Sequence, residues 1–456
     1  MTAAERRRHS PVPPASSRRG GSDGPSLRPR ADRRLRPAGS STMSPFRRAR
    51  GARPSRAPLG PDFARLWCVS ALTNLGDGAL IAAGPLLVAS LSPSPLAVSA
   101  ASALQMLPHL LFSLTSGALV DRLPRRGVLA AANLARGVVL ALLTAVILSG
   151  SASPWPVYAA VFALGVGETL ADTAYGSLLP SVVHRDALGR ANARLALTFS
   201  VNNQLVGPPL GALMFAALWA LPFGFDALAY LVSALVVLRI RPTPPPPGTG
   251  HGSGARTTLR SDVAQGLAFV WGSPGLRTLC GCILVMNLAG VGAFALWVLY
   301  AREHLGLSDT GFGLFVTAGA AGGVLGSQVY GWLEARVGRA FLLRWGLVVE
   351  AATYLALTLT TDGLVAGVVM VLFGVHTVVW GTAATTVRQR LTPDRLLGRV
   401  GGVYRLADLG GASLGAVAGG LIAEYAGLLV PFWIATAAVG LLAVSAWRPL
   451  VTTQRL

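Results

Sequence analysis

The chain has 456 residues, of which 52% are apolar and only 13% are charged, about half the charged fraction of an average soluble domain. Together with a mean hydropathy of +0.55, this composition disfavours a water-soluble enzyme and indicates a membrane protein. The three cysteines, Cys68, Cys280 and Cys282, lie in apolar runs and lack the spacing of a disulfide framework or a zinc site, so no metal site is expected.

Residues 1–60 hold 15 arginines and three acids, so +12 of the formal net charge of +20 lies in this segment. Because the segment is also rich in Pro, Ser and Gly, it predicts a disordered cytoplasmic tail. No apolar core precedes residue 63, so a cleaved signal peptide is not expected. Alternatives are an arm that contacts anionic lipid headgroups or nucleic acid, or a stretch upstream of a start at Met43. Nucleic acid is not an expected partner, because interleaved aromatic residues are absent.

Apolar runs long enough to cross a bilayer follow one another along the rest of the chain. They cover residues 63–90, 95–118, 128–149, 156–182, 194–217, 221–239, 277–300, 310–333, 340–360, 363–386, 403–425 and 428–447. This pattern predicts an all-α polytopic membrane protein with twelve transmembrane helices. Lipid bilayer and a small-molecule substrate are the expected partners, and the protein is expected to be a monomer.

Arginines in the loops lie almost entirely on one side of these spans, and the opposite side receives only Arg302. The positive-inside bias therefore places both termini in the cytoplasm of a protein in the cytoplasmic membrane. A Pro- and Gly-rich loop divides the spans into two sets of six. The predicted domains are a tail (1–60), a six-helix bundle (61–240), a cytoplasmic linker (241–275), a second six-helix bundle (276–448) and a C-terminal tail (449–456).

The two predicted bundles share sequence features in the same order. A similar segment occurs twice, 214 residues apart. The first copy is Gly117-Ala-Leu-Val-Asp121-Arg122-Leu-Pro-Arg125-Arg126, and the second is Gly331-Trp-Leu-Glu334-Ala-Arg336-Val-Gly338-Arg339. Leu188-Gly-Arg recurs as Leu397-Gly-Arg, and Gly207-Pro208-Pro-Leu-Gly211 as Gly411-Ala-Ser-Leu-Gly415. Repeats of this kind predict two pseudo-symmetric bundles with the substrate site near the midplane between them.

The segment from Gly117 to Arg126 resembles the helix 2–3 signature of the major facilitator superfamily. Asn74-Leu-Gly-Asp77 and Leu188-Gly-Arg-Ala-Asn192 are similar to its macrolide-efflux and enterobactin-exporter branch. The resemblance implies secondary active export driven by the proton gradient, without a cofactor. It also implies gating roles for Asp121, Arg122 and Arg126, although charge that only sets topology is the alternative.

Gly207, Pro208 and Gly211 are similar to the antiporter motif of that superfamily in its fifth helix, although Asn203 stands where the motif has a glycine. Small residues at four-residue spacing allow helices to approach closely. We therefore expect these residues to combine close packing with gating.

Ionisable residues inside spans are costly, so they mark either a transport pathway or a paired structural site. Asp77, Arg136, Glu168 and Asp172 are the candidates. Arg136 and Glu168 lie at similar depths on successive helices, which makes an ion pair between them possible. Glu168, Asp172 and Tyr175 share one helix face. Because two carboxylates this close repel each other, one would readily take up a proton, as proton coupling requires.

For three other polar residues in the spans, roles outside proton coupling and substrate binding are favoured. Asp226 is one turn from the outer start of its helix, so a solvated interfacial acid is expected. Glu350 occupies the repeat position of Arg136, and a structural role is favoured. His376 is expected to be a satisfied polar residue, with a proton relay as the alternative.

No nucleotide-binding loop, nucleophile motif or metal-ligand cluster appears in the sequence, so an enzyme is not expected. The favoured function is proton-coupled export of amphipathic small molecules, such as a drug, a macrolide or a siderophore. The alternatives are a proton-coupled importer of a small nutrient and a non-transporting membrane sensor.

Overall fold

The computed structural model describes residues 59–120, 123–241 and 259–452, and within these ranges all regular structure is helical. The first part contains α1 (Pro61–Leu91), α2 (Pro95–Val120), α3 (Arg125–Leu148), α4 (Pro154–Val182), η2 (Arg185–Ala187), α5 (Leu188–Thr198), η3 (Phe199–Val206), α6 (Gly207–Ala217) and α7 (Leu221–Val237). The second contains α8 (Leu259–Gly272), α9 (Pro274–Phe294), α10 (Trp297–Leu299), η4 (Tyr300–His304), α11 (Asp309–Val337), α12 (Arg339–Leu359), α13 (Gly363–Leu391), η5 (Asp394–Leu396), α14 (Leu397–Ala426), α15 (Val430–Ala446) and α16 (Pro449–Thr452).

Eight of the helices in the described residues are long and apolar enough to cross a membrane, so the chain is an all-helical, multi-pass membrane protein. Helices α7 and α15 are each 17 residues long and fall just short of such a span. The tail predicted over residues 1–60 lies, up to residue 58, outside the described residues.

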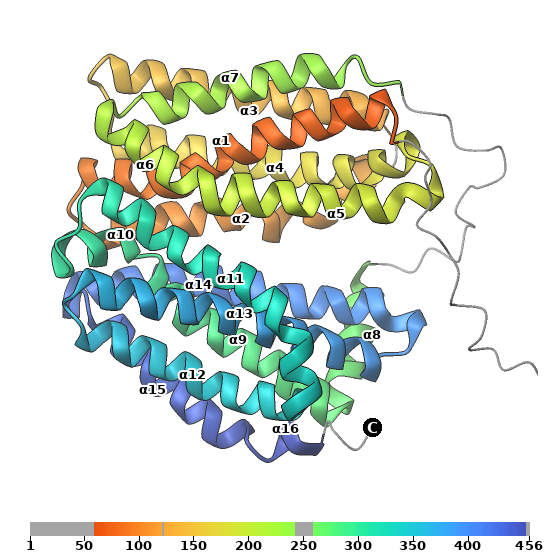
Figure 1. The fold of residues 1–456 in the computed structure, drawn as a ribbon, viewed down its shortest axis with the longest axis vertical. Coiled ribbons are helices and arrows are strands. Elements are labelled where there is room, and N and C mark those ends of the chain that lie inside the picture. Colours follow the sequence, from red (N-terminus) through yellow and green to blue (C-terminus); the bar gives the residue numbers. More distant parts are fainter. Residues whose placement is uncertain (1–58, 121–122, 242–258, 453–456) are drawn as a thin grey trace, which may run out of the picture. The chain divides into compact units, whose positions relative to one another are not determined.

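The same helix pairings occur in both parts of the chain (Figure 1). Helix α1 packs on α6 and α7, as α9 packs on α14 and α15. Helices α2 and α4 are paired as α11 and α13 are, and α3 packs on α7 as α12 packs on α15. Contacts between the two parts also come in an equivalent pair, α2 with α14 and α6 with α11.

Glycines on α6 allow it to lie directly against α1. A Cβ added at Gly207 would lie 2.5 Å from the Cα of Gly78, and one at Gly211 would overlap the backbone of Ala79. The opposite side of α6 meets α11, where a Cβ on Gly313 would lie 2.6 Å from that of Ala212. Helix α14 uses Gly415 in the same way, against the backbone of α9. The predicted helix 5 motif therefore lies where three helices come closest.

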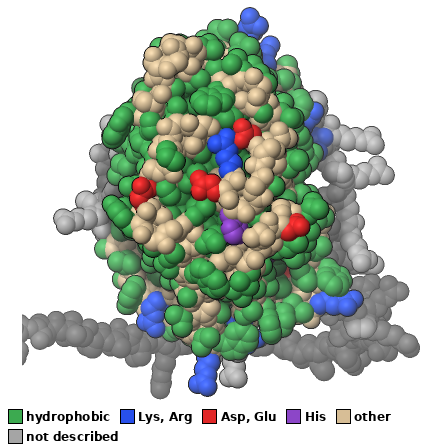
Figure 2. Space-filling model, turned by 90° about the vertical axis from the view of Figure 1, so that its left-hand side faces the viewer, with side chains coloured by type: hydrophobic (Ala, Val, Ile, Leu, Met, Phe, Trp, Pro, Cys, Tyr) green, Lys and Arg blue, Asp and Glu red, His purple; other side chains and the backbone are tan. Residues whose placement is uncertain are grey.

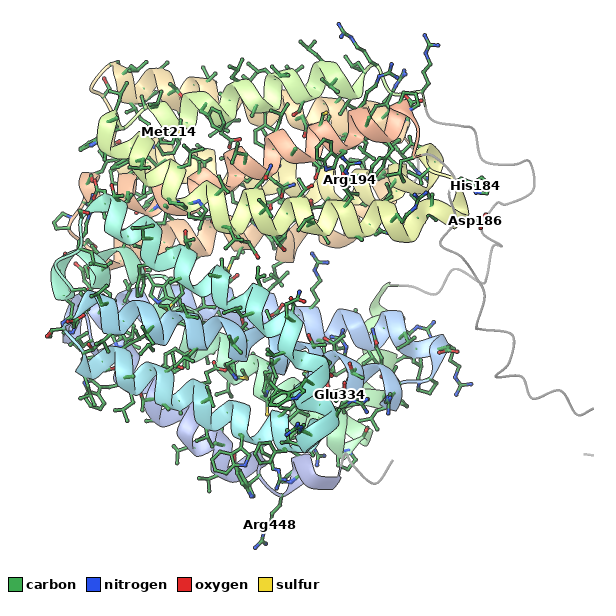
Figure 3. The ribbon with its side chains drawn as sticks, viewed as in Figure 1. His184, Asp186, Arg194, Met214, Glu334 and Arg448 are labelled. Atoms are coloured by element: carbon green, nitrogen blue, oxygen red, sulfur yellow. The ribbon has the colours of Figure 1, made fainter. Side chains whose placement is uncertain are left out.

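The run predicted as one helix over 194–217 is interrupted by a π-helix, η3, directly before Gly207. Pro208 and Pro209 have no amide hydrogen, so the carbonyls four residues earlier lose their α-helical donors. The wider π turn is one way in which a helix accommodates such a loss. Figure 3 shows that this broken helix runs the length of the bundle, from His184 and Asp186 at one end towards Met214 near the other.

Helix α8 lies inside the segment that the sequence predicted as a linker, residues 241–275. It packs on the start of α14, where a Cβ on Gly266 would lie 2.6 Å from the carbonyl oxygen of Arg399. The Arg399 guanidinium also donates to Gln265 at 2.7 Å. Residues 259–272 are therefore part of the folded bundle, and the Pro-rich part, 242–258, lies outside the described residues.

At one end of the helices the two parts of the chain share a single apolar core. This core joins Leu86 and Phe215 to Phe312 and Phe432. Polar contacts cross there as well: Ser94 donates to Glu424 at 2.7 Å, and the Arg302 guanidinium donates to Ser90 at 3.2 Å. Figure 2 looks onto this end, where hydrophobic side chains predominate and charged ones are few.

Towards the opposite end, each part has a core of its own. One is built around Phe63 and Leu129, and the other around Leu279 and Trp380. The apolar packing is therefore continuous across the two parts at one end and divided between them at the other.

Candidate functional site

A cavity of about 880 Å³ lies among α1–α5, η3 and α7 and contains the predicted acidic residues. Its wall includes Asp77 of α1, Arg136 of α3, and Glu168 and Asp172 of α4. The volume is within the usual range for pockets that hold small molecules. Tyr175 lines the same wall, which confirms that it shares a face of α4 with the two acids.

Arg136 links three helices beside this cavity. Its guanidinium donates to Asp77 Oδ1 at 3.0 Å and lies 4.2 Å from the centre of the Tyr230 ring on α7. The Tyr230 hydroxyl donates to the same carboxylate oxygen at 2.6 Å. The stem of Arg136 fits against α4 because position 167 is a glycine, whose Cβ would lie 2.6 Å from Arg136 Cγ. Asp77, Arg136 and Tyr230 thus form one buried polar cluster.

Glu168 does not form the ion pair with Arg136 that its depth in the sequence allowed. Its carboxylate lies 3.5 Å from Nε2 of His109 on α2, and Arg136 is paired with Asp77 instead. The depth of a residue in the membrane, counted along the sequence, gives only its position along the helix. The direction of each side chain around the helix axis selects the partner, and it favours α2 for Glu168.

The hydrogen bonds of Thr169 favour the tautomer of His109 that has its hydrogen on Nδ1. The Thr169 hydroxyl donates to the carbonyl oxygen of Gly165 at 2.8 Å, so its oxygen accepts from His109 Nδ1 at 3.2 Å. In the neutral imidazole, Nε2 then has a lone pair and faces the lone pairs of Glu168. The contact is attractive only when one further proton is on Nε2 or on the carboxyl group. A proton shared between His109 and Glu168 would therefore make this contact favourable.

Asp172 is one helical turn beyond Glu168 and is exposed in the cavity. It forms no ion pair with any residue that the structure describes. With Asp77 and Glu168 it gives the cavity wall three carboxylates and one guanidinium, that of Arg136. His109 lies beside Glu168, and Arg405 of α14 also interacts electrostatically with Asp172, so the acids still outnumber the arginines. This imbalance favours a cationic occupant.

The expectation of a solvated, interfacial Asp226 is wrong. The side chain is fully buried, and neither carboxyl oxygen has a hydrogen-bond partner among the described residues. It fills the space beside Gly76 of α1, where an added Cβ would overlap the Asp226 carboxyl group. Close packing of α1 on α7 removes it from the surface.

Of the predicted gating motif, Asp121 and Arg122 lie outside the described residues, and Gly117 lies in the last turns of α2. Arg126 donates to the carbonyl oxygen of Ile240, just beyond α7, at 3.0 Å. In the repeated motif, Glu334 and Arg339 form an ion pair across the turn between α11 and α12. These basic turns tie neighbouring helices together at one end of each bundle.

His109 and Tyr230 were missed by reasoning from sequence. The available signal for His109 was a single histidine inside an apolar run, a feature that does not identify a partner. Within the described ranges, no group of three or more His, Cys, Asp or Glu side chains could hold a metal ion.

Residues 54–453 match the profile of the transmembrane secretion effector family of the major facilitator superfamily. The chain belongs to the major facilitator superfamily. The predicted family is therefore confirmed, and this family consists of transporters and not of enzymes.

Known relatives support the same assignment. The multidrug efflux pump Tap of Mycolicibacterium fortuitum is 29% identical over 382 residues, which cover 80% of this chain and 90% of the relative. The enterobactin exporter EntS of Escherichia coli O1:K1 / APEC is 27% identical over 75% of this chain and 80% of its own. The crystal structure of a mutant of the nucleoside transporter NupG superposes with a TM-score of 0.71 at 9% identity, covering 85% of this chain and 99% of that one. The last comparison shows the fold alone.

Proposed function

We propose that this chain is a secondary active transporter that exports amphipathic small molecules, cationic ones in particular, by proton antiport. The observation that carries the proposal is the cavity with three carboxylates in its wall, one of which, Glu168, lies 3.5 Å from His109 Nε2. Two relatives, a multidrug efflux pump and an enterobactin exporter, support export as the direction of transport.

The proposal includes twelve membrane spans in two six-helix bundles, over residues 61–240 and 276–448. Equivalent helix pairings in the two parts of the chain support a duplicated bundle. Four elements beyond the eight clearly apolar spans complete the count: α4, the broken helix from α5 to α6, α7 and α15. The segments 1–60, 241–275 and 449–456 would then be cytoplasmic, and the protein would act as a monomer in the cytoplasmic membrane.

Arginine placement supports the orientation. The end with the shared apolar core holds Arg302, which donates to Ser90 there, while Figure 3 shows Arg194 towards the other end. The positive-inside bias then assigns the divided end to the cytoplasm. In this orientation the described conformation is closed to the outside, and alternation would require the shared core around Leu86 and Phe312 to separate.

Coupling would occur at Glu168. With a proton on the Glu168–His109 pair, the cavity retains less negative charge and binds a cation more weakly. A cation in the cavity repels that proton, so the proton and the cationic substrate do not bind at the same time. An antiporter needs this exclusion, because it prevents the inward proton movement from occurring without outward movement of substrate.

Asp77, Asp172 and Arg136 would act around this pair. Asp172, which has no ion-pair partner within the described ranges, would meet the substrate directly, whereas Arg136 would hold Asp77 and set the shape of the wall. Gly117, Asp121, Arg122 and Arg126 would control the cytoplasmic gate. Gly207, Pro208 and Gly211 would let α6 slide between α1 and α11.

Transport in everted membrane vesicles from a strain without its own drug pumps tests the proposal. An exporter should accumulate ethidium in energised everted vesicles, and nigericin, which collapses the pH gradient, should abolish the accumulation. Proton-linked accumulation only in right-side-out vesicles would support the importer alternative. Absence of gradient-dependent movement in both preparations, at normal expression, would support the sensor.

A further inference from the structure

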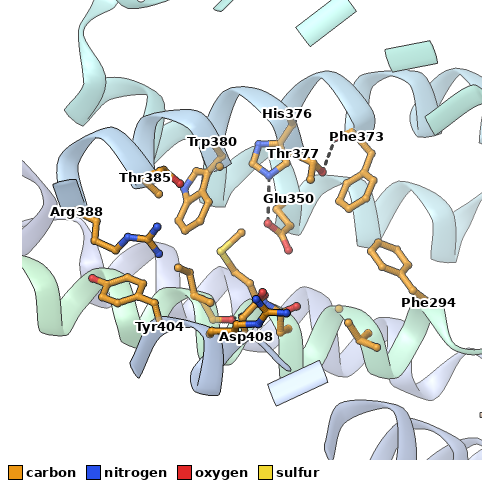
Figure 4. A pocket seen from close by; sticks show the side chains of 18 of the residues that line it. Phe294, Glu350, Phe373, His376, Thr377, Trp380, Thr385, Arg388, Tyr404 and Asp408 are labelled. Carbon is orange, nitrogen blue, oxygen red and sulfur yellow. Dashed lines mark hydrogen bonds and ion pairs between the residues drawn. The ribbon is translucent and has the colours of Figure 1, made fainter. Parts of the chain in front are cut away.

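A second cavity, of about 590 Å³, lies among α9, α12, α13 and α14 and contains a buried acid–histidine pair. Nε2 of His376 lies 3.1 Å from Glu350 Oε2, and each of the two side chains is only 5% exposed. The Tyr354 hydroxyl donates to the other Glu350 oxygen at 3.0 Å. Figure 4 shows this pair in the wall of the cavity, with Phe294 and Phe373 on one side of it.

The chain duplication relates this pair to Arg136. Glu350 follows Arg136 by 214 residues, the spacing of the Gly117 and Gly331 motifs. His376 follows Gly167 by 209 residues, the spacing of Leu188 and Leu397. Gly167 is the residue against which Arg136 packs. Beside the second cavity, the carboxylate of Glu350 therefore takes the position of the Arg136 guanidinium, and the imidazole of His376 takes the position of Gly167.

The hydrogen bonds leave the pair with one negative charge. Because a carboxylate can only accept, a hydrogen bond in this contact requires a hydrogen on His376 Nε2, and with a neutral imidazole the pair then has one negative charge. Among the described residues, no hydrogen bond to His376 Nδ1 is formed. A proton on Nδ1 would cancel the charge, and so would a cation beside Glu350.

Other charged and titratable groups lie around the cavity, and Figure 4 shows Asp408 across the cavity from Glu350. These groups are Cys282, Arg388, Tyr404, Arg405 and Asp408. Arg388 lies over the Tyr404 ring at 4.9 Å, and Figure 4 shows both beyond Trp380, away from Phe294 and Phe373. Trp380 donates its indole hydrogen to Leu343, so its ring is an apolar wall of the cavity. The lining near Glu350 thus includes the aromatic rings of Phe294, Phe373 and Trp380, which suit an organic cation through cation–π attraction, beside the negative charge of the pair.

We propose that Glu350 and His376 form a second binding site, in the C-terminal bundle, for an organic monocation with an aromatic or aliphatic body, and that a proton on the pair displaces this cation. The site is separate from the Glu168 cavity and requires neither export nor antiport. Its failure would leave the proposed function intact, and failure of the proposed function would not remove it.

Protection of an engineered cysteine from alkylation tests the site in the purified full-length protein. With the three native cysteines replaced by alanine, Thr377→Cys places a thiol in the second cavity and Thr73→Cys places one in the first. Ethidium should slow the reaction of N-ethylmaleimide at both positions. Adding Glu350→Gln should abolish protection at position 377 and leave it at position 73, which serves as the control for folding. Unchanged protection at position 377 would overturn the proposal.

The same assay without any change at Glu350 keeps the test decisive if that variant does not fold. The rate of reaction with N-ethylmaleimide at position 377 is measured over a range of ethidium concentrations, relative to the rate without ethidium. Half-maximal protection should need more ethidium at pH 5.5 than at pH 8. Protection that needs the same ethidium concentration at both pH values would contradict displacement by a proton.

Discussion

Replacing Arg136 with glutamine should strongly destabilise the protein, because the buried guanidinium holds the half-buried Asp77 carboxylate between α1, α3 and α7. Arg136 is only 7% exposed, and its loss would leave Asp77 with the single donor Tyr230. Breaking a buried ion pair costs about 3–5 kcal/mol. We expect the lower end, about 3 kcal/mol, because the Asp77 side chain retains 29% exposure in the cavity.

A double-mutant cycle separates this pair from general loss of packing. Arg136→Gln and Asp77→Asn should each lower the thermal stability of the detergent-solubilised protein, and the double variant should lose less than the sum of both changes. Asp172→Asn is the matched control, since Asp172 forms no ion pair with a described residue and should change stability by under about 1 kcal/mol. If the double variant loses as much stability as the sum of the two single variants, the Arg136–Asp77 ion pair is refuted. Equal loss in the control would show that any acid in the cavity has the same effect.

Three further predictions concern packing, coupling and topology. Gly211→Ala should lower the free energy of unfolding by at least about 1–3 kcal/mol, because the new methyl group would overlap the Ala79 backbone. Gly176→Ala is the control: it has open space around it and should be neutral or stabilising. Thermal melting of both variants checks this. His109→Gln should reduce proton-driven ethidium transport far more than ethidium binding, and an equal loss of both would point to a structural role. Reporters fused after residues 151 and 305 should read extracytoplasmic, and those after 125 and 250 cytoplasmic; a loop at 250 that reads outside would refute the two-bundle topology.

Hydropathy predicted the helices well, because a membrane span needs a long apolar run whatever its neighbours are. The run at 128–149 became α3 at Arg125–Leu148, and the run at 340–360 became α12 at Arg339–Leu359. The break at η3 was not predicted, although Pro208 and Pro209 were visible. Helix α8 was missed because the preceding proline run suggested a linker throughout.

Partners of the charged residues were harder to predict, because a sequence gives depth along a helix but not direction around it. Arg136 was matched by depth with Glu168, yet it is paired with Asp77. Asp226 was placed near water, yet the absence of a side chain at Gly76 allows α1 to bury it. Glu350 and His376 were considered one at a time, and only the packing of α12 on α13 brings them together.

The central claim is that a proton on the Glu168–His109 pair drives export, and Glu168→Gln tests it most directly. The variant keeps the shape of the side chain but cannot hold the proton. In proteoliposomes, uphill ethidium transport driven by a pH gradient should be lost, while exchange of ethidium without a gradient should continue. Uphill transport at the wild-type rate across the external pH range would contradict the claim, and Asp77 would then be the residue to examine.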